Sequence, residues 1–481
     1  MDGRVSLRLR HLFSDTLIYG SARVFASMVG ALLIPLYVRR LEVSDYGAIE
    51  NINVFLALAP PVIGLSLYAA IYRFCPPGEA EKRANFGAVL VGTLIVMSVG
   101  ALLFAPAAAP MASTLLGGRT ALFSWTLFLL ASIIATNTVL LTWMNVEMMK
   151  REYVRATLGA TTLQLLLAVL FVGVARWGVA GFVAASVIAQ TMALAYAFSV
   201  ARSHIELSGS IKRLWPMIVY SAAFVPGAFA VFMMRSSDRY ILSILNGGDL
   251  KEIGLYAMAE KMALPVALLG AAFSQAFPAF GLRLSQGAAS QTLLRDIFRL
   301  YVASTAVFSF LCSALSVPFL RLIGARAFLA SAQYTPFLAL YLSLNSLVAI
   351  GSLAVYISGK PRAVISSSMA AAAVNLLANL ILIPPYGVWG AVWSTVLAFA
   401  VYNIVVFWLG EKDFSPGYPF TAATVTYLVT LTAGWFSQKG PGFALVAAAT
   451  MAIALFATRI VESSDLARLN SLVRSRRTSS T

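Results

Sequence analysis

Residues 178–200 read GVAGFVAASVIAQTMALAYAFSV, a run of 23 residues without a charged side chain. An α-helix rises about 1.5 Å per residue, so this run is long enough to cross the hydrocarbon core of a bilayer, which takes about 20 residues. Apolar runs of similar length recur along the chain, with short charged loops between them. The sequence therefore predicts a membrane-spanning helix here and a series of such helices elsewhere.

The overall composition also indicates a membrane protein. Of the 481 residues, 60% are hydrophobic and 11% are charged, whereas soluble domains carry about 25% charged residues. In lipid, only helices and closed barrels satisfy their backbone hydrogen bonds. Barrel strands would show alternating segments of about ten residues, which the long runs do not. We predict an all-α integral membrane fold.

The apolar runs predict about fourteen transmembrane helices. We expect them at residues 14–38, 45–72, 86–110, 120–145, 153–175, 178–200, 214–237, 252–280, 296–320, 328–357, 362–384, 387–410, 418–437 and 441–460. The expected organisation is a cytoplasmic tail (1–13), an N-lobe of spans 1–6 (14–200), a cytoplasmic linker (201–213), a C-lobe of spans 7–12 (214–410), spans 13–14 (418–460) and a basic cytoplasmic tail (461–481).

The basic residues predict the orientation. The net charge is +16, and positively charged loops favour the cytoplasmic side. With these spans, 23 basic residues fall on the side of the N-terminus and 10 on the other. We therefore expect a bacterial inner-membrane protein with both termini in the cytoplasm, and no nucleic-acid partner. Cys75 and Cys312 form no disulfide framework or zinc pattern, and His11 and His204 are isolated, so we predict no metal site.

Two sequence pairs indicate an internal repeat. GVAGFVAASVIA at 178–189 and GVWGAVWSTVLA at 387–398 share six of twelve positions, 209 residues apart. Tyr46-Gly47 and Ile253-Gly254 open the second and eighth spans, 207 residues apart. Six spans separate each pair, so the two six-helix lobes share one orientation and are related by a pseudo-two-fold axis along the membrane normal. A substrate site is expected where such lobes meet; chance likeness between small-residue helices is the alternative.

Basic residues within or at the ends of spans are candidates for substrate binding. A charge at the centre of a membrane helix costs about 2.5–3.5 kcal/mol on insertion scales, so each is a functional hypothesis. The candidates are Arg23, Arg73, Arg235, Arg239 and Lys261. Arginine offers a forked donor to phosphate, so this set favours an anionic substrate. The alternatives are a snorkelling or packing role for Arg23 and a positive-inside anchor for Arg73.

Three carboxylates are candidates for charge balance or ion coupling: Glu50, Asp238 and Glu260. Glu50 lies near the outer end of its span, where an interfacial role is the alternative. Asp238 belongs to residues 217–247, a segment too long for one straight span. This segment is either a broken helix whose charges border a cleft or an outer helix end with an interfacial extension. Prolines within spans, among them Pro60, Pro226 and Pro265, permit kinks.

Signals of enzymatic activity are missing from the sequence. It has no P-loop, no G-x-S-x-G and no H-E-x-x-H motif. A membrane polymerase or ligase of glycans would need a sizeable external loop or a catalytic pair, and neither is evident. We therefore expect a transporter without a bound cofactor rather than an enzyme.

Three motifs in order resemble one known family. They are LEVSDYG at 41–47, Asp238-Arg239-Tyr240 followed by GLYA at 254–257 and Lys261, and IPPYGVWGA at 383–391. With this order and spacing, residues 10–410 resemble the Wzx-type oligosaccharide flippases. These form the polysaccharide-transporter family of the multidrug/oligosaccharidyl-lipid/polysaccharide exporter superfamily.

The resemblance implies the substrate and the partners. It implies a positively charged cavity and a polyprenyl-diphosphate-linked oligosaccharide that moves from the cytoplasmic to the outer leaflet by alternating access. An ion gradient or the membrane potential would drive transport. The implied partners are this lipid-linked oligosaccharide, membrane lipids, and polysaccharide polymerase and export proteins. Many members have twelve spans, so the role of spans 13 and 14 stays open. A cation-coupled multidrug exporter of the same fold is the alternative.

Overall fold

The computed structural model describes residues 32–75, 81–110, 121–206, 210–245, 249–284, 290–357, 362–412 and 416–462. Within these ranges the regular structure is helical, with no strand, which confirms the predicted all-α fold. The chain forms two compact units, which are described separately. Unit 1 comprises Met1–Gly254 and Ile323–Ala325, and unit 2 comprises Leu255–Leu322 and Arg326–Thr481.

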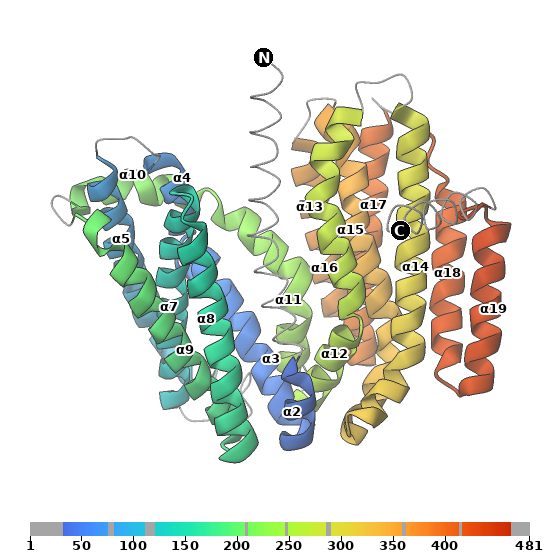
Figure 1. Ribbon diagram of the computed structural model, residues 1–481, viewed down its shortest axis with the longest axis horizontal. Coiled ribbons are helices and arrows are strands. Elements are labelled where there is room, and N and C mark those ends of the chain that lie inside the picture. The colour runs from blue at the N-terminus through green and yellow to red at the C-terminus, as the bar shows by residue number, and fades with distance from the viewer. Residues whose placement is uncertain are drawn as a thin grey trace, which may run out of the picture. The chain divides into compact units, whose positions relative to one another are not determined.

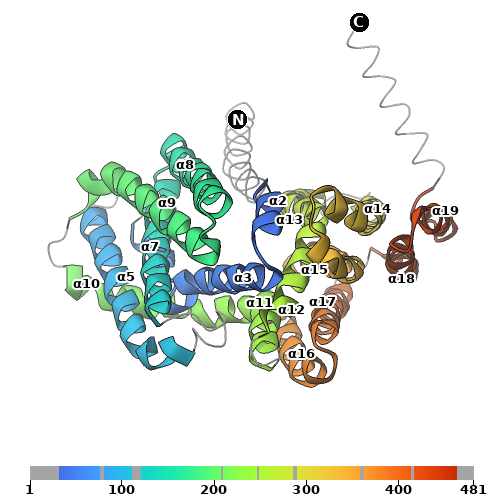
Figure 2. The same ribbon diagram turned by 90° about the horizontal axis from the view of Figure 1, so that it is seen from below.

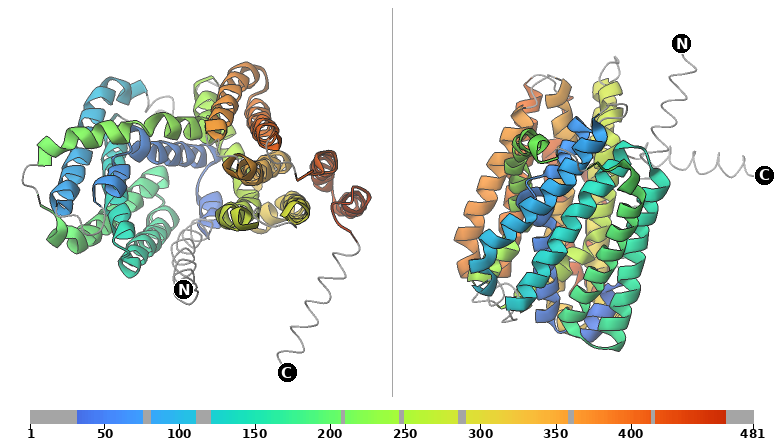
Figure 3. Two further views of the ribbon diagram at one scale, coloured as in Figure 1. Left: turned by 90° about the horizontal axis from the view of Figure 1, so that it is seen from above. Right: turned by 90° about the vertical axis from the view of Figure 1, so that its left-hand side faces the viewer.

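Unit 1 contains several long helices packed side by side (Figure 1). Its helices are α2 (Ile34–Arg40), α3 (Val43–Leu58), η1 (Ala59–Ile63), η2 (Leu67–Ala69), α4 (Ala70–Phe74), α5 (Lys82–Phe104), η3 (Ala105–Ala107), α7 (Ala121–Val146), α8 (Lys150–Ala168), η4 (Val169–Val174), α9 (Gly178–Ala201), η5 (Arg202–His204), α10 (Ser210–Ala222) and α11 (Val225–Leu245). The right-hand view of Figure 3 shows α5, α7, α8 and α9, in blue to green, side by side.

One buried cluster of unit 1 contains Phe86 of α5 and Trp143 of α7. The rings of Phe86 and Trp143 stack with centroids 4.9 Å apart, and His204 lies against the same indole. Lys82 pairs with Glu147 at 3.1 Å. These contacts hold the ends of α5, α7 and α9 together, and these are the loops predicted to face the cytoplasm.

Unit 1 contains two breaks at prolines. The helix of α3 continues into the π-helical turn η1, which contains Pro60 and Pro61. Ser66 donates a hydrogen bond to the Pro61 carbonyl oxygen at 2.8 Å, which satisfies a backbone group in the irregular turn. Between α10 and α11 the chain bends by 41°, just before Pro226. Of the two alternatives for residues 217–247, the structure shows a broken helix. The break lies before Pro226 rather than at the charged residues, and proline lacks a backbone donor.

Unit 2 contains most of the C-terminal helices (Figures 1 and 2). They are α12 (Leu250–Met262), α13 (Leu264–Leu284), α14 (Ser290–Leu322), η6 (Arg326–Tyr334), α15 (Thr335–Ile357), α16 (Arg362–Tyr386), α17 (Val388–Glu411), α18 (Phe420–Ser437) and α19 (Pro441–Ala457). The first turn of α12 belongs to unit 1, because the units divide after Gly254. A bend of 57° separates α12 from α13 next to Pro265.

Of the last two helices of unit 2, α18 makes most of the contacts with the rest of the unit. Thr305 of α14 and Tyr427 of α18 share a buried hydrogen bond of 2.9 Å. Gln438 donates to the carbonyl oxygen of Ala332 at 2.7 Å. By contrast, α19 packs mainly on α18 and exposes apolar side chains such as Leu445, at 75%. This exposed surface is what a helix at the lipid boundary requires.

The described residues contain nine helices that are long and apolar enough to span a membrane, or up to eleven when each bent pair counts as one span. The first expected span, 14–38, lies mostly outside the described residues. The predicted turns near 176 and 387 are confirmed by Gly178 and Gly387. Both have left-handed backbones, with φ of +57° and +52°, and each precedes a long helix. These glycines occupy equivalent positions in the predicted repeat.

The two compact units differ in extent from the predicted lobes. Helices α10 and α11 pack on α4, α5, η1 and α3, so contacts assign them to unit 1 and divide the chain at 254 rather than at 201–213. The predicted lobes follow the repeat instead of the contacts and stay a prediction. The tails 1–13 and 463–481 lie outside the described residues.

Candidate functional site

A buried ion pair joins two membrane helices of unit 1. Glu50, on the third turn of α3, is 4% exposed, and Arg239, in the second half of α11, is 8% exposed. Arg239 Nη1 lies 3.7 Å from Glu50 Oε2. In Figure 2, α11 runs alongside α3. Taking both charges out of water is costly unless they stay paired, so this contact fixes the two helices to each other.

Neutral and acidic groups complete this cluster, which we call the α3–α11 charge cluster: Tyr46, Glu50, Asp238 and Arg239. Tyr46 precedes Glu50 by one helical turn and hydrogen-bonds to its side chain. The buried Asp238 carboxylate accepts the backbone N–H of Arg239 at 2.9 Å. The cluster carries two carboxylates and one guanidinium. The fold thus brings the candidates Glu50 and Arg239 together, and Asp238 adjoins Arg239 in the chain. Tyr46 was missed because a neutral aromatic residue in an apolar run gives no signal.

Two of the three remaining candidate arginines, Arg23 and Arg235, are placed only in part or not at all. Arg23 lies outside the described residues. Arg235 lies in α11, one turn before Arg239, and only its backbone is described. The predicted excess of basic over acidic side chains near α3 and α11 therefore stays a prediction.

Arg73 lies at a different corner of unit 1. It is exposed at the end of α4, and its guanidinium carbon is 4.9 Å from the ring centroid of Tyr220 in α10 and 5.7 Å from that of Phe74. An arginine over an aromatic face is held by a cation–π interaction while its fork stays accessible. This arrangement allows Arg73 to contact an anion at the membrane surface.

A second acidic group lies in unit 2 at the bend of a broken span. Glu260 and Lys261 are half-buried residues of the last turn of α12. The hydroxyl of Tyr341 in α15 donates a hydrogen bond to Glu260 Oε1. This contact lies next to the 57° bend between α12 and α13. Tyr341, like Tyr46, was missed by sequence reasoning.

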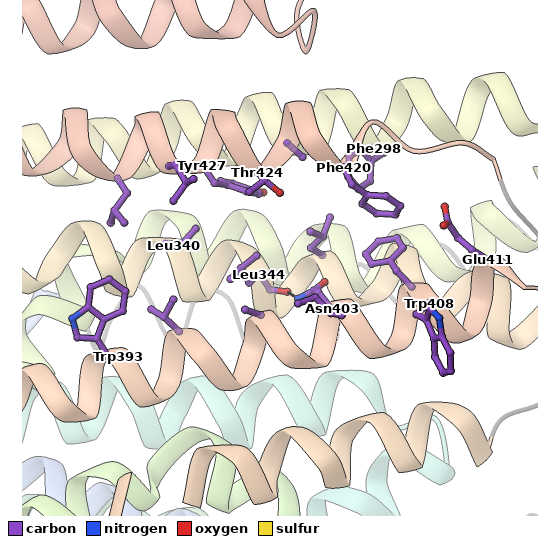
Figure 4. Close-up of a pocket in the computed structure, with 18 residues that line it drawn as sticks. Phe298, Leu340, Leu344, Trp393, Asn403, Trp408, Glu411, Phe420, Thr424 and Tyr427 are labelled. Atoms are coloured by element: carbon purple, nitrogen blue, oxygen red, sulfur yellow. Dashed lines mark hydrogen bonds between the residues drawn. The ribbon is translucent and has the colours of Figure 1, made fainter. Parts of the chain in front are cut away.

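Unit 2 also contains an apolar groove of about 560 Å³. Figure 4 shows Trp393 at one end and Trp408 with Glu411 at the other. Its walls come from α14, α15, α17 and α18, whose first residue, Phe420, is among them. The lining residues are Phe298, Leu340, Leu344, Leu347, Trp393, Val396, Ala400, Asn403, Ile404, Phe407, Trp408, Glu411, Phe420, Ala423, Thr424, Tyr427, Leu428 and Leu431.

The groove is suited to a hydrocarbon chain. Its walls are aliphatic and aromatic, and polar groups are few. The amide of Asn403 is directed into the helix packing, because it donates to the carbonyl oxygens of Leu344 and Phe399, each at 2.8 Å. In a membrane, such a groove attracts a hydrocarbon chain through van der Waals packing, because lipid is as apolar as its walls. Sequence reasoning missed the groove, since its residues come from four helices without a shared motif.

Comparison with known proteins identifies the fold. No family model matches the chain, and no curated protein matches it. Among solved structures, the lipid II flippase MurJ in an inward closed conformation has a TM-score of 0.66 at 12% identity, covering 94% of this chain and 99% of its own. A multidrug resistance MATE family transporter of the MOP superfamily, in an outward-facing conformation, gives 0.50 at 15% identity, with 83% and 93% covered.

A third neighbour is a MOP superfamily transporter from Pyrococcus furiosus, with a TM-score of 0.50 at 14% identity over 83% of this chain and 93% of its own. At such identities a likeness shows the fold alone. The chain therefore shares the all-α fold of these three solved structures, and the MurJ structure matches a larger share of the chain, 94%, than the other two do.

Proposed function

We propose that this protein is a flippase that moves a polyprenyl-diphosphate-linked oligosaccharide from the cytoplasmic to the outer leaflet of the bacterial inner membrane, for surface polysaccharide or exopolysaccharide synthesis. The observation that carries the proposal is the fold likeness to a lipid II flippase over 94% of the chain. The motifs of the Wzx-type family and the apolar groove of unit 2 support it.

The diphosphate is the part of the substrate that the arginines recognise. The Arg239–Glu50 distance of 3.7 Å exceeds the roughly 2.7–2.9 Å of a charge-assisted hydrogen bond. A phosphate with several acceptor oxygens matches the forked donor geometry of a guanidinium. In the proposed mechanism the diphosphate takes the place of Glu50 at Arg239. Arg23, Arg73, Arg235 and Lys261 bind the same anion or its acidic sugars along its path.

The acidic candidates supply charge balance or ion coupling in this proposal. They are Glu50, Asp238 and Glu260, and of these Glu50 pairs with Arg239. An ion gradient or the membrane potential drives the cycle, since the sequence has no P-loop for a nucleotide.

The groove of unit 2 holds the polyprenyl chain in this proposal. Its volume of about 560 Å³ suits part of a long hydrocarbon tail. One wall is formed by α18, the predicted span 13, so this span has a role in the proposal that a twelve-span transporter would lack. Polysaccharide polymerase and export proteins are the proposed downstream partners.

A cation-coupled multidrug exporter is the second candidate. The observation that favours it is the charge cluster of α3 and α11, in which the described groups are two carboxylates and one guanidinium. A carboxylate-rich site suits a cationic drug, and MATE transporters share the fold.

A deletion strain tests the proposed function. Lipid-linked glycan is extracted from the strain, and its distribution between leaflets is measured with a membrane-impermeant glycan-modifying enzyme. The proposal predicts that glycan lipid accumulates on the cytoplasmic leaflet and that the wild-type gene clears it. Normal surface polysaccharide without accumulation, together with increased drug sensitivity, would favour the exporter.

A further inference from the structure

The apolar groove of unit 2 ends at a carboxylate. Glu411 is the last residue of α17, and Figure 4 shows it beside Trp408 at one end of the groove. Glu411 is half-buried. In the part of the chain that the structure describes, its carboxylate forms no hydrogen bond or ion pair. An ionised carboxylate accepts hydrogen bonds at both oxygens, so this end of the groove can bind a donor.

The cations near this end of the groove are held by other groups. Lys412 follows Glu411 directly, but its Nζ lies 3.4 Å from the ring centroid of Trp408, in the geometry of a cation–π interaction. Arg295 of α14 donates from Nη2 to the carbonyl oxygen of Pro416 at 2.9 Å, in the segment that leads to α18. The described groups around this end of the groove thus include a carboxylate and two cations.

The groove is long enough for an acyl chain. Trp393 and Trp408 mark its two ends, and they are 15 residues apart on α17, which corresponds to about 22 Å at 1.5 Å per residue. One leaflet of the hydrocarbon core is roughly 15 Å deep, half the thickness of the whole core. An acyl chain whose headgroup lies at Glu411 therefore fits within the length of the groove.

The charges at this end favour one kind of headgroup. A primary ammonium has three N–H donors and forms a charge-assisted hydrogen bond with a carboxylate. A phosphate in the same headgroup suits the neighbouring Lys412 and Arg295. A diphosphate without an ammonium places its negative charge beside Glu411, where like charges repel. The diphosphate lipid of the proposed function, whose headgroup is assigned to other residues, leaves this carboxylate without a partner.

We propose that the groove of unit 2 binds a phospholipid with an ethanolamine headgroup, with one acyl chain along α17 and the ammonium on Glu411. The inference goes beyond the proposed function, because this lipid is a bound ligand and not the transported substrate. It occupies the surface assigned above to the polyprenyl chain, so the two lipids exclude each other there. Its binding is measured without transport, and the result does not depend on whether the protein is a flippase.

Photo-labelling tests this site in the full-length protein. The protein is reconstituted in phosphatidylglycerol vesicles with a trace of a phospholipid probe, which carries a diazirine at the end of one acyl chain and an ethanolamine, choline or glycerol headgroup. After illumination, labelled peptides of α17 and α18 are quantified by mass spectrometry. Glu411→Gln is compared with Asp296→Asn, which removes a negative charge from the same predicted side of unit 2 at a residue that does not line the groove.

The ethanolamine probe is expected to label the groove peptides of the wild type about fivefold more than the other two probes, because it alone offers charged N–H donors to the carboxylate. Glu411→Gln should remove most of this preference, and Asp296→Asn should retain it. Equal labelling of the wild type by the three probes, or an unchanged preference in Glu411→Gln, would overturn the proposal.

A filled groove covers the case in which Glu411→Gln disturbs the fold. Ala400→Trp places a large ring among the groove walls and should suppress labelling of the groove peptides by the ethanolamine probe. Ala449→Trp, on the exposed face of α19, is the control and should be labelled like the wild type. Size-exclusion profiles identify the folded variants. Ethanolamine-selective labelling that persists in folded Ala400→Trp protein would place the lipid on another surface and contradict the proposal.

Discussion

At the residue scale, unit 1 contains a buried ion pair between Glu50 and Arg239. Glu50 and Arg239 lie within helices that the membrane would otherwise keep apolar, and each is over 90% buried. Removing one partner of such a pair leaves an unpaired buried charge, whereas removing both is often tolerated. This difference separates a structural role of the pair from its role in transport.

Single and double variants of the pair use this difference. Arg239→Gln is expected to destabilise the protein by about 3–5 kcal/mol, because it leaves the Glu50 carboxylate unpaired. Glu50→Gln together with Arg239→Gln should recover most of this loss but should not restore lipid transport, since the anion has lost its guanidinium. Unfolding in detergent and lipid flipping in vesicles measure the two effects. A double variant that transports normally would remove Arg239 from the substrate site.

Tyr341 is expected to matter through Glu260. Tyr341→Phe removes the hydroxyl that donates to this carboxylate, and leaving a buried or half-buried polar group without its partner costs about 1–3 kcal/mol. Tyr386→Phe is the matched control, because Tyr386 is 63% exposed and should be neutral. Thermal unfolding of both variants measures the effect. Equal stability of the two variants would show that Glu260 does not depend on Tyr341.

Glu81 gives a pH-dependent prediction outside the membrane. A hydrogen bond from Arg213 and its charge hold the pKa of the Glu81 carboxyl below its ordinary value. A lowered folded-state pKa stabilises the protein above the unfolded pKa, and this stabilisation disappears as the pH falls through the folded pKa. The Tm of wild type should therefore exceed that of Glu81→Gln at pH 7, and the difference should vanish in acid. The difference should also shrink at high salt, because the pair is exposed. A difference that persists unchanged in acid would contradict this account.

At the scale of elements, the sequence predicts helices and their breaks well. Long uncharged runs give the spans, Gly178 and Gly387 give the turns, and Pro60, Pro226 and Pro265 lie next to the observed breaks. The contact partners of these elements were not predictable. Gly47 meets a backbone carbonyl, which leaves no trace in the side-chain pattern.

The groove of unit 2 was likewise not predictable from the sequence. Its walls combine ordinary apolar residues from α14, α15, α17 and α18, and each of these residues looks like any other membrane-facing position in the sequence. Tyr46 and Tyr341 were missed for a similar reason, since a tyrosine in an apolar run resembles an interfacial anchor. Only the charged members of the site, such as Glu50 and Arg239, could be selected from the sequence, because charges in spans are costly.

Filling the groove should block transport without unfolding the protein. Ala400→Trp places a large ring among the groove walls and should reduce polyprenyl-lipid transport at least tenfold, because the tail loses its site. Ala449→Trp on the exposed face of α19 is the control and should transport normally. Size-exclusion profiles and transport rates in vesicles compare the two. Normal transport by a folded Ala400→Trp variant would assign the tail to another surface.

At the scale of the whole molecule, loops predicted to lie on one side of the membrane contact each other within their own unit. In unit 1, Lys82 pairs with Glu147 and Glu206 donates its N–H to the Arg83 carbonyl oxygen at 3.2 Å. In unit 2, Arg299 pairs with Glu462 at 2.9 Å. All of these loops are predicted to be cytoplasmic, so the order of spans derived from charge agrees with the contacts inside each unit.

The most direct test of the proposed function is lipid flipping by the purified protein. Vesicles are prepared with a fluorescent polyprenyl-diphosphate glycan in both leaflets, and a membrane-impermeant reductant bleaches the outer leaflet. The flippase account predicts that bleaching proceeds beyond the outer-leaflet share when the protein is present and an ion gradient is applied, and that a lipid without the diphosphate is not moved. Bleaching that stops at the share of protein-free vesicles, or equal movement of both lipids, would contradict it.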